Sequence, residues 1–446
     1  MKDLTKGNIY KTFILFAIPL VLSGLLSQAY AIIDSVIAGK FLGADGIAAT
    51  GATGALIQFV SSVFWGYTAG FSIYVAVLFG AKEYDRLKNT IYSNFLIFTF
   101  GAMLASAIMI FFKEGIFDFL KVDNTIRKDA STYFVTYISG LFSILLTNFG
   151  ALCLNAMGMS GYPFKMAIVS SVLNIGGNII SVTLLKMGVF GIALSSVIAA
   201  TVVDVCYVIK MRQCFREMRS EKNFKMHFSL GTIKKTVSYA IPSTFQQFVM
   251  YAASFVISPM INRLGSGMTA AFAVSNRIYE INAGVYQNSS KTLSNYTAQC
   301  VGAKKYNLIN KGIGVGFLQG ALLVMPFVLG CAIFAKPLCM AFFPSEYAGE
   351  GLEYSVVFAK WYLPFILFNV VNNLFHAFYR GIKNMKMLLI TTCFGSVVRA
   401  VATAILSVEY GIHGVYAGWV ISWILEAILC TVTFLWNQTK KTIIAK

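Results

Sequence analysis

Long apolar stretches alternate with short polar gaps along the whole chain. An α-helix needs about 20 predominantly apolar residues to cross the hydrocarbon core of a bilayer. The pattern predicts twelve membrane-spanning helices, near residues 13–38, 48–79, 90–112, 131–156, 163–185, 188–209, 237–262, 269–300, 312–335, 354–379, 385–408 and 412–436. The eighth stretch is the weakest, because polar residues interrupt it. We include it since an even number of spans suits the distribution of charges described below.

Composition supports a protein of the bilayer. Of the 446 residues, 57% are hydrophobic and 12% are charged, whereas a soluble domain carries about 25% charged residues. The sequence therefore predicts an all-α polytopic membrane protein. The eight cysteines lie mainly inside apolar stretches without regular spacing, which is typical of small core residues and not of disulfides or metal ligands.

The net charge of +18 is distributed unevenly between the predicted gaps. With both termini cytoplasmic, the inner segments hold 24 Lys and Arg residues and the outer segments hold 9. The positive-inside rule therefore predicts a multi-pass protein of the cell (cytoplasmic) membrane with both termini in the cytoplasm. The excess of positive charge indicates topology and contact with anionic lipid headgroups, and not nucleic acid.

Short motifs recur at a separation of half the chain. Phe16-Ala-Ile-Pro19 returns as Tyr239-Ala-Ile-Pro242, and Gly80-Ala-Lys82-x-Tyr84 returns as Gly302-Ala-Lys304-x-Tyr306. Together with two further pairs, they fit an offset of 221 to 223 residues. An even number of helices in each half gives both halves the same orientation, as in transporters built from parallel repeats.

The repeat predicts two pseudo-symmetric six-helix bundles around a central cleft. We expect an N-terminal lobe, a basic cytoplasmic linker and a C-terminal lobe at residues 1–209, 210–235 and 236–446. Rocking of two such lobes gives alternating access to a cleft between them.

One carboxylate lies inside the first predicted helix. Asp34 shares a helix face with Tyr30, and Asn174 and Asn178 share a face of the fifth predicted helix. A carboxylate within the bilayer is costly unless it is protonated, paired or hydrated, so it suggests an ion or proton site. The alternative is an acid near the outer helix end, solvated or paired with Lys40. At an offset of 222 residues Asp34 corresponds to a valine, so the second half has no equivalent acid.

The second half has two polar faces instead. In the eighth predicted helix Glu280 lies three residues from Arg277, so it is either a functional acid or the partner of that arginine. In the tenth, His376 either binds a proton or donates hydrogen bonds in a hydrated cavity. Asp204 and Glu426 are placed near helix ends and interpreted as structural. The predicted substrate cavity comprises Tyr133, Tyr137, Glu280, Gln287, Asn369, Asn373 and His376.

Signals of enzymatic chemistry are missing from the sequence. It contains no Walker A sequence, no HExxH or comparable metal-ligand spacing and no Gly-x-Ser-x-Gly elbow. We expect no enzyme activity, no metal and no cofactor. The 38 Phe and 17 Met residues include candidates for binding flat, apolar cations through cation–π and thioether contacts.

Several motifs in order resemble the multidrug and toxic compound extrusion (MATE) family. They are Phe16-Ala-Ile-Pro19, Tyr30-x-x-x-Asp34, Gly39-Lys-Phe-Leu-Gly43-Ala-Asp45, Phe79-Gly-Ala-Lys82-x-Tyr84-Asp85, Ala298-Gln299-x-Val301-Gly-Ala-Lys304 and Tyr379-Arg380-Gly381. The resemblance covers essentially the whole chain. It implies two six-helix lobes and antiport of organic cations against protons or sodium ions. We expect a monomer, because a closed pair of lobes requires no partner.

The resemblance also assigns residues. Asp34 matches the first-helix acid that this family uses for coupling, and Asn174 matches an asparagine of the same pocket; Asn178 stands where some members have an aspartate. The seventh-helix glutamate of sodium-coupled members has no counterpart, and their tenth-helix aspartate falls on Asn369. A proton is thus the expected coupling ion, with sodium as the alternative. The predicted coupling set is Tyr30, Asp34, Asn174, Asn178 and Ser196.

Two other functions stay open at this point. A flippase for lipid-linked saccharides would need a cation-rich cavity, and Arg277, Lys291 and Arg399 are few for that purpose. A membrane-embedded enzyme would need a catalytic pair or metal cluster at the bilayer interface. The expected partners are small organic cations and the lipid bilayer, with no nucleic acid.

Overall fold

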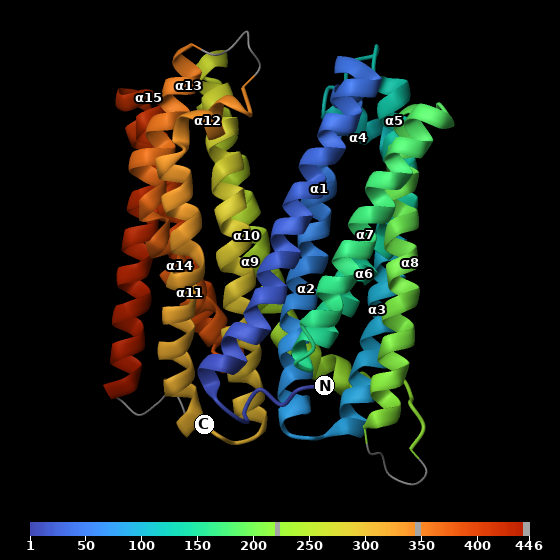
Figure 1. Cartoon of the computed structure of the whole chain (residues 1–446), viewed down its shortest axis with the longest axis vertical. Coiled ribbons are helices and arrows are strands. Elements are labelled where there is room, and N and C mark those ends of the chain that lie inside the picture. The colour runs from blue at the N-terminus through green and yellow to red at the C-terminus, as the bar shows by residue number, and fades with distance from the viewer. Residues whose placement is uncertain (219–223, 344–348, 440–446) are drawn as a thin grey trace. The chain divides into compact units, whose positions relative to one another are not determined.

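The computed structural model describes residues 1–218, 224–343 and 349–439, which are almost entirely helical and include no strand (Figure 1). The first half of the chain holds α1 (Ile9–Ala52), α2 (Gly54–Gly80), α3 (Tyr84–Phe111), α4 (Lys113–Phe119), α5 (Arg127–Ser139), α6 (Leu141–Ala156), α7 (Gly161–Ile179), η1 (Ile180–Leu184) and α8 (Gly188–Glu217). The second half holds α9 (Leu230–Asn262), α10 (Ser266–Gly302), α11 (Asn307–Ile333), α12 (Ala335–Met340), α13 (Glu350–Val357), η3 (Phe358–Tyr362), η4 (Leu363–Phe365), α14 (Ile366–Gly381) and α15 (Met385–Thr439). The predicted all-α fold class is confirmed.

Eight of the described helices are long and apolar enough to cross a membrane, or nine when α5 and α6, bent by 44°, count as one span. Two of the predicted gaps contain a break in the helical backbone. Gly43, in the gap at 39–47, and Gly411, in the gap at 409–411, have non-helical backbone, so α1 and α15 each consist of two helices joined at a kink. The weak eighth stretch forms α10, which is not among the eight apolar spans. The number of twelve crossings stays a prediction.

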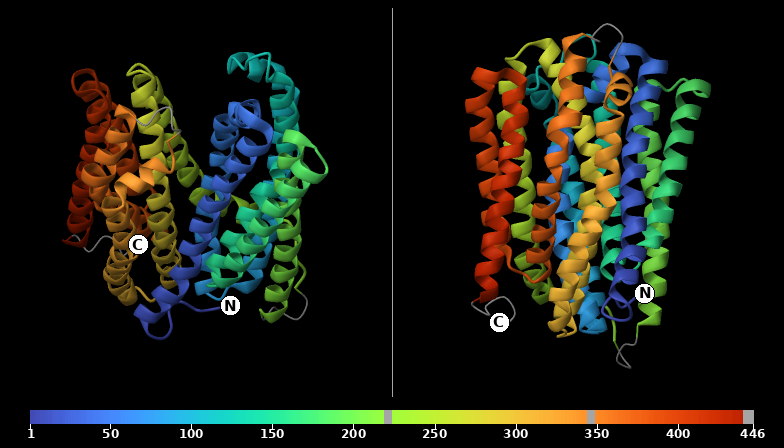
Figure 2. Two further views of the ribbon diagram at one scale, coloured as in Figure 1. Left: turned by 45° about the horizontal axis from the view of Figure 1, so that its top comes forward. Right: turned by 60° about the vertical axis from the view of Figure 1, so that its left-hand side comes forward.

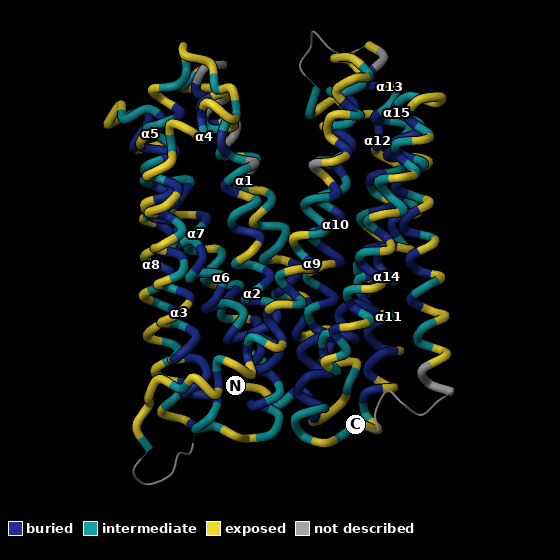
Figure 3. The backbone as a smooth tube through the Cα atoms, turned by 180° about the vertical axis from the view of Figure 1, so that it is seen from behind, coloured by how far each residue is buried: buried dark blue, intermediate teal, exposed yellow. Residues whose placement is uncertain are grey.

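Apolar side chains cover exposed faces of several helices. On α3, Leu96, Phe100, Met103 and Leu104 are exposed at helical spacing, and α11 exposes a comparable stripe around Leu322. Figure 3 shows the exposed positions running along these helices. A soluble protein does not leave such long apolar faces in contact with water. Their natural environment is the hydrocarbon of a bilayer, so the chain is a multi-pass membrane protein.

The described chain divides into two compact units. Unit 1 comprises residues 1–3 and 22–244, and unit 2 comprises residues 4–21 and the chain from Phe245 onward. In unit 1, α8 packs against α5, α6 and α7; in unit 2, α14 packs against α10, α11 and α15 (Figure 2). Both α1 and α9 contribute residues to each unit. The lobe and linker boundaries expected from the sequence stay predictions.

The internal repeat extends to backbone conformation. Gly43 and Gly265 both have positive φ, at 72° and 95°, and Gly188 and Gly411 do so at 59° and 55°. Each pair is separated by 222 or 223 residues. Left-handed backbone is strained for most L-residues and favours glycine. The two halves therefore break their helices at corresponding positions.

Lysine occupies the left-handed position after five helices. Every described non-glycine residue with positive φ is a lysine that follows a helix by two positions. After α2, the N–H of Lys82 donates to Phe79 O at 3.1 Å and that of Glu83 to Leu78 O at 3.1 Å, which is a Schellman cap. The five lysines are Lys82, Lys121, Lys186, Lys304 and Lys383. A positive charge here also lies favourably at the negative end of the helix dipole.

Candidate functional site

The half-buried Asp34 on α1 lies against two asparagines of α7. Asn178, which is fully buried, donates from Nδ2 to Asp34 Oδ1 at 2.7 Å and to Asn174 Oδ1 at 3.2 Å. Asn174 Nδ2 in turn donates to Ser196 Oγ on α8 at 2.9 Å. The structure thus brings together four of the five residues of the predicted coupling set.

The amide of Asn174 fits this site in two orientations. Its atom that faces Asp34 lies 2.7 Å from Oδ1 and 3.2 Å from Oδ2. If that atom is the nitrogen, it donates to the carboxylate, and Oδ1 of Asn174 accepts from Ser196 Oγ at 2.9 Å. The hydrogen bond from Asn178 Nδ2 to Asn174 is then lost, because two nitrogens face each other at 3.2 Å. If it is the oxygen, two oxygens meet at hydrogen-bond distance, and only a protonated Asp34 can supply the hydrogen between them.

Small residues hold α7 close to α8 beside these asparagines. A Cβ added to Gly191 would lie 2.6 Å from Ser181 Oγ, and one added to Gly177 would lie 2.9 Å from Ser195 Oγ. Ser195 also donates to Gly191 O at 2.8 Å. Such close contacts of small residues are a common way of packing membrane helices. They fix the distance between the Asn174 amide and α8.

The π-helical segment η1 begins two residues after Asn178. Single π-helical turns inside α-helices are frequent at functional sites. Tyr30, the fifth predicted coupling residue, and the predicted cavity residues Tyr133 and Tyr137 lie within electrostatic range of Asp34. The rings of Tyr133 and Tyr137 stack with their centroids 5.8 Å apart. All three tyrosines therefore lie near the acid in unit 1.

The other predicted cavity residues lie in unit 2 and form separate groups. Asn369 Nδ2 donates to Tyr286 Oη at 2.9 Å and to Tyr279 Oη at 3.2 Å, and Asn373 Nδ2 donates to Asn369 O at 3.2 Å. Gln287 is exposed on α10. Glu280 lies near Arg277, its sequence-predicted partner.

His376 belongs to a further cluster, which includes an acid that the sequence interpretation set aside. Its Nε2 lies 3.2 Å from Glu426 Oε1 on α15 and 3.1 Å from Thr391 Oγ1. The placement of Glu426 and Asp204 near helix ends is wrong. Glu426 lies well inside α15, and α8 continues thirteen residues beyond Asp204, whose carboxylate accepts from Thr147 Oγ1 at 2.8 Å.

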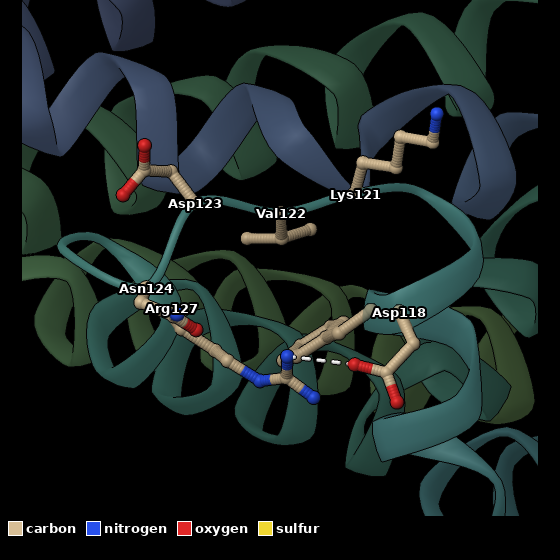
Figure 4. Close-up of a pocket in the computed structure, with 7 residues that line it drawn as sticks. Asp118, Lys121, Val122, Asp123, Asn124 and Arg127 are labelled. Carbon is tan, nitrogen blue, oxygen red and sulfur yellow. Dashed lines mark hydrogen bonds and ion pairs between the residues drawn. The ribbon is translucent and has the colours of Figure 1, made fainter.

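One shallow pocket of about 430 Å³ opens between α4 and α5 and contains none of the predicted residues. Figure 4 shows Arg127 reaching Asp118 across it, at 2.8 Å between Nη1 and Oδ1. The other terminal nitrogen donates to Glu114 at 2.8 Å. The Arg127 guanidinium thereby holds the pKa of the Glu114 carboxyl below its ordinary value. These exposed pairs order the loop, and none of the described residues forms a cluster suited to a metal ion.

Comparison with known proteins places both halves in one family. The MatE family profile matches residues 19–180 and again residues 242–405. The probable multidrug resistance protein YoeA of Bacillus subtilis (strain 168) is 24% identical over 335 residues, which cover 72% of each chain. The probable multidrug resistance protein YpnP of the same organism is 22% identical over 429 residues, 93% of this chain and 92% of that one.

Solved structures share the fold. A MATE protein crystallised in complex with MaL6 superposes with a TM-score of 0.91 at 18% identity, over 99% of this chain and 98% of the other. An outward-facing multidrug resistance MATE family transporter of the MOP superfamily gives 0.90 at 19% identity, again over 99% and 98%. The family resemblance predicted from the sequence motifs is confirmed, and the interpretation as an enzyme is set aside. The chain belongs to the MatE family of membrane transporters.

Proposed function

We propose that the protein is a secondary antiporter of the cell membrane that exports amphipathic organic cations in exchange for protons. Asp34 takes up and releases the proton, and Asn174, Asn178 and Ser196 adjust to its charge. Two relatives are named probable multidrug resistance proteins, which supports an export role for this chain.

The contact between Asn174 and Asp34 carries the proposal. At 2.7 Å from Oδ1, the amide donates to an ionised Asp34 through its nitrogen and accepts from a protonated Asp34 through its oxygen. Either state keeps a hydrogen bond at this contact after a half-turn of the amide. A buried acid that is well partnered in both states can change its protonation without a large penalty from a lost hydrogen bond.

The same half-turn of the Asn174 amide also reverses its hydrogen bond with Ser196 on α8. With its nitrogen towards Ser196, Asn174 donates to Oγ, and the Ser196 hydroxyl donates to Ile192 O at 3.2 Å. With its oxygen towards Ser196, Asn174 accepts from that hydroxyl instead. The charge on Asp34 is therefore coupled to hydrogen bonding between α7 and α8. This gives a physical route from proton binding on α1 to a neighbouring helix pair.

Energetics favour ion exchange for a cationic substrate. Moving one charge against the membrane potential costs about 2.3 kcal/mol per 100 mV. Export of a cation therefore needs inward movement of positive charge. Protons entering at Asp34 meet this need without a metal or cofactor, and sodium is the alternative ion. The stacked Tyr133 and Tyr137 rings near the acid are suited to contact with a flat cation.

The orientation proposed for the chain rests on its lysines and arginines. The 24-to-9 distribution between the two sides supports cytoplasmic termini. We propose that the protein acts as a monomer in contact with lipid.

The first experiment is ethidium accumulation in an efflux-deficient bacterium that expresses the wild type or Asp34→Asn at equal membrane abundance. We expect the wild type to lower accumulation and the variant to lose that effect. The matched control is Asp204→Asn, another acid within unit 1, which is expected to export. An ionophore series then separates a proton gradient from a sodium gradient.

Two results contradict the proposal. Equal export by the wild type and Asp34→Asn would show that the first-helix acid is not used for coupling. If neither protein lowers accumulation, lipid-linked saccharides or metabolites become the better candidates for cargo, and the flippase alternative gains weight.

A further inference from the structure

Unit 2 contains a buried histidine–carboxylate pair that the export proposal does not use. His376 on α14 and Glu426 on α15 are 8% and 9% exposed, and Nε2 lies 3.2 Å from Oε1. Asn372 Nδ2 lies 3.3 Å from Glu426 Oε2. A histidine is the side chain that most readily changes charge near neutral pH, and a carboxylate beside it stabilises the charged ring.

The hydrogen bonds define which ring nitrogen is free to accept a proton. Thr391 donates its hydroxyl to Met387 O at 2.9 Å, so its oxygen is available to accept from Nε2 of His376 at 3.1 Å. Nε2 thus carries a hydrogen that lies between Thr391 and Glu426. The other nitrogen, Nδ1, faces Gln246 Nε2 at 3.5 Å. A donor in that direction means that Nδ1 is unprotonated in this arrangement.

Gln246 is held in this orientation by an arginine. Arg380 Nη2 donates to Gln246 Oε1 at 2.7 Å, which turns the amide nitrogen towards His376 and towards Thr392 Oγ1 at 3.1 Å. A proton on Nδ1 would face that nitrogen. The Gln246 amide must then turn its oxygen to the ring, and the bond to Arg380 breaks.

From these contacts we infer that His376 and Glu426 form a second proton-binding site, in which one proton from water adds to the lone pair of His376 Nδ1 and releases Gln246 from Arg380. The ligand is the proton alone, and no other bond is made or broken. The Glu426 carboxylate stabilises the charged ring, whereas nearby positive charge opposes it. The charged or titratable groups at the cluster are Arg380 on α14 and Cys430 on α15, and Lys291 on α10 lies near Arg380, while α9 presents the uncharged Gln246.

A glycine makes room for the carboxylate. A Cβ added to Gly395, on the first part of α15, would lie 2.3 Å from Glu426 Oε2 and 2.5 Å from its Cδ. Gly395→Ala therefore displaces the carboxylate and keeps every titratable group. The matched control is Gly314→Ala on α11, where an added Cβ meets nothing within 4 Å.

The test is NMR of the full-length protein with ¹⁵N-labelled histidine, in lipid nanodiscs, across a pH series. The chain has only three histidines, so His227 and His413 serve as internal references for folding. The nitrogen shifts of each ring report its tautomer and its protonated fraction. This readout is independent of transport, so its result and that of the export assay can be told apart.

We expect Glu426→Gln to lower the ratio of protonated to neutral His376 about tenfold or more, measured at the pH where the wild-type ring is half protonated, because it removes the carboxylate charge. Gly395→Ala should lower the ratio by less, and Gly314→Ala should leave it unchanged. Gln246→Glu should raise it, because an acceptor replaces the amide donor that faces Nδ1.

An unchanged His376 titration in Glu426→Gln, with the two reference signals at their wild-type positions, would overturn the inference. If Glu426→Gln disturbs the reference signals, Gly395→Ala decides instead. Wild-type behaviour of His376 in a folded Gly395→Ala protein would likewise overturn it.

Discussion

The acids of the two units have different hydrogen-bonding partners. In unit 1, Asp34 is hydrogen-bonded by the neutral amide of Asn178 and contacts that of Asn174. In unit 2, Glu426 contacts His376. His376 faces Gln246, which accepts a hydrogen bond from Arg380. Neutral partners let the charge of an acid change with only an amide rotation. Basic partners tie the same change to the charges around it.

The acids and their partners differ although the backbone conformation repeats between the two halves. The left-handed positions Gly43 and Gly265, and Gly188 and Gly411, correspond in the two halves, but the acids do not. Asp34 corresponds to Val256, which is exposed on α9. Helix ends and breaks are therefore retained where backbone geometry demands them, whereas buried polar chemistry differs between the halves. Four changes test this comparison.

The largest effect is expected at Asn178. Asn178→Ala removes the donor to Asp34 Oδ1 and leaves the carboxylate with one fewer buried partner, a loss of about 1–3 kcal/mol. Proton-driven ethidium export should fall about tenfold or more at equal abundance. Export equal to that of the wild type would mean that Asp34 does not depend on its amide partners. The different partners of the acids in the two units would then have no effect on transport.

A second change tests the packing of α8 against α7 and the η1 segment that follows it. Gly191→Ala places a Cβ within 2.7 Å of both Cβ and Oγ of Ser181, so we expect a destabilisation of about 1–3 kcal/mol. Gly176→Ala meets nothing within 4 Å and should stabilise α7 by about 0.5–1 kcal/mol. The midpoints of thermal unfolding of the purified variants should therefore move in opposite directions. Shifts of the same sign would show that close packing does not position the unit 1 site.

A smaller effect is expected at the lysine caps after α2 and α10, where the two halves have the same backbone conformation. Lys304→Gly relieves left-handed strain of about 1–2 kcal/mol after α10, and Lys82→Gly should do the same after α2. Loss of the positive charge at the helix end offsets part of this gain. Both variants should show a similar small rise in thermal midpoint, and Lys304→Ala should not. Unequal responses of the two glycine variants would indicate that the caps are not energetically equivalent.

The smallest effect is expected at the outer loop of unit 1, because Arg127 corresponds to Gly349 and has no counterpart in unit 2. Arg127→Gln removes two exposed ion pairs, which usually contribute little. Since the pKa of Glu114 is lowered in the folded protein, this contribution is present above the ordinary carboxyl pKa and is lost as pH falls through the lowered value. The thermal midpoints of the variant and the wild type should differ slightly at pH 7 and converge at acid pH, below the lowered pKa of Glu114. A difference that grows towards acid pH would contradict this assignment.

Spacing along one helix was enough to predict much of the unit 1 site. Asn174 and Asn178 lie one turn apart, and a single acid in the first apolar helix identified their partner. The contact with Ser196 also joins the predicted set. Helix type and most boundaries followed from apolar stretches alone, because a bilayer leaves the backbone few other ways to satisfy its hydrogen bonds.

The His376–Glu426 pair could not be obtained in the same way. The two residues are 50 positions apart on separate helices, and their contact depends on how α14 packs against α15. Glu426 was interpreted as lying near a helix end, but α15 continues to Thr439. The signal available in the sequence was Gly395, whose missing side chain makes room for the carboxylate.

The lysine caps have a consequence for the choice of membrane. Each of these residues both ends its helix and carries a charge that avoids hydrocarbon, so the length of the helix is set by hydrogen bonds that cannot move along the chain. Such a helix cannot lengthen by a turn in a thicker bilayer or unwind in a thinner one. It must tilt, or the lipid must deform around it. We therefore expect the protein to respond to acyl-chain length and anionic lipid content when it is reconstituted, even where its binding sites are unchanged.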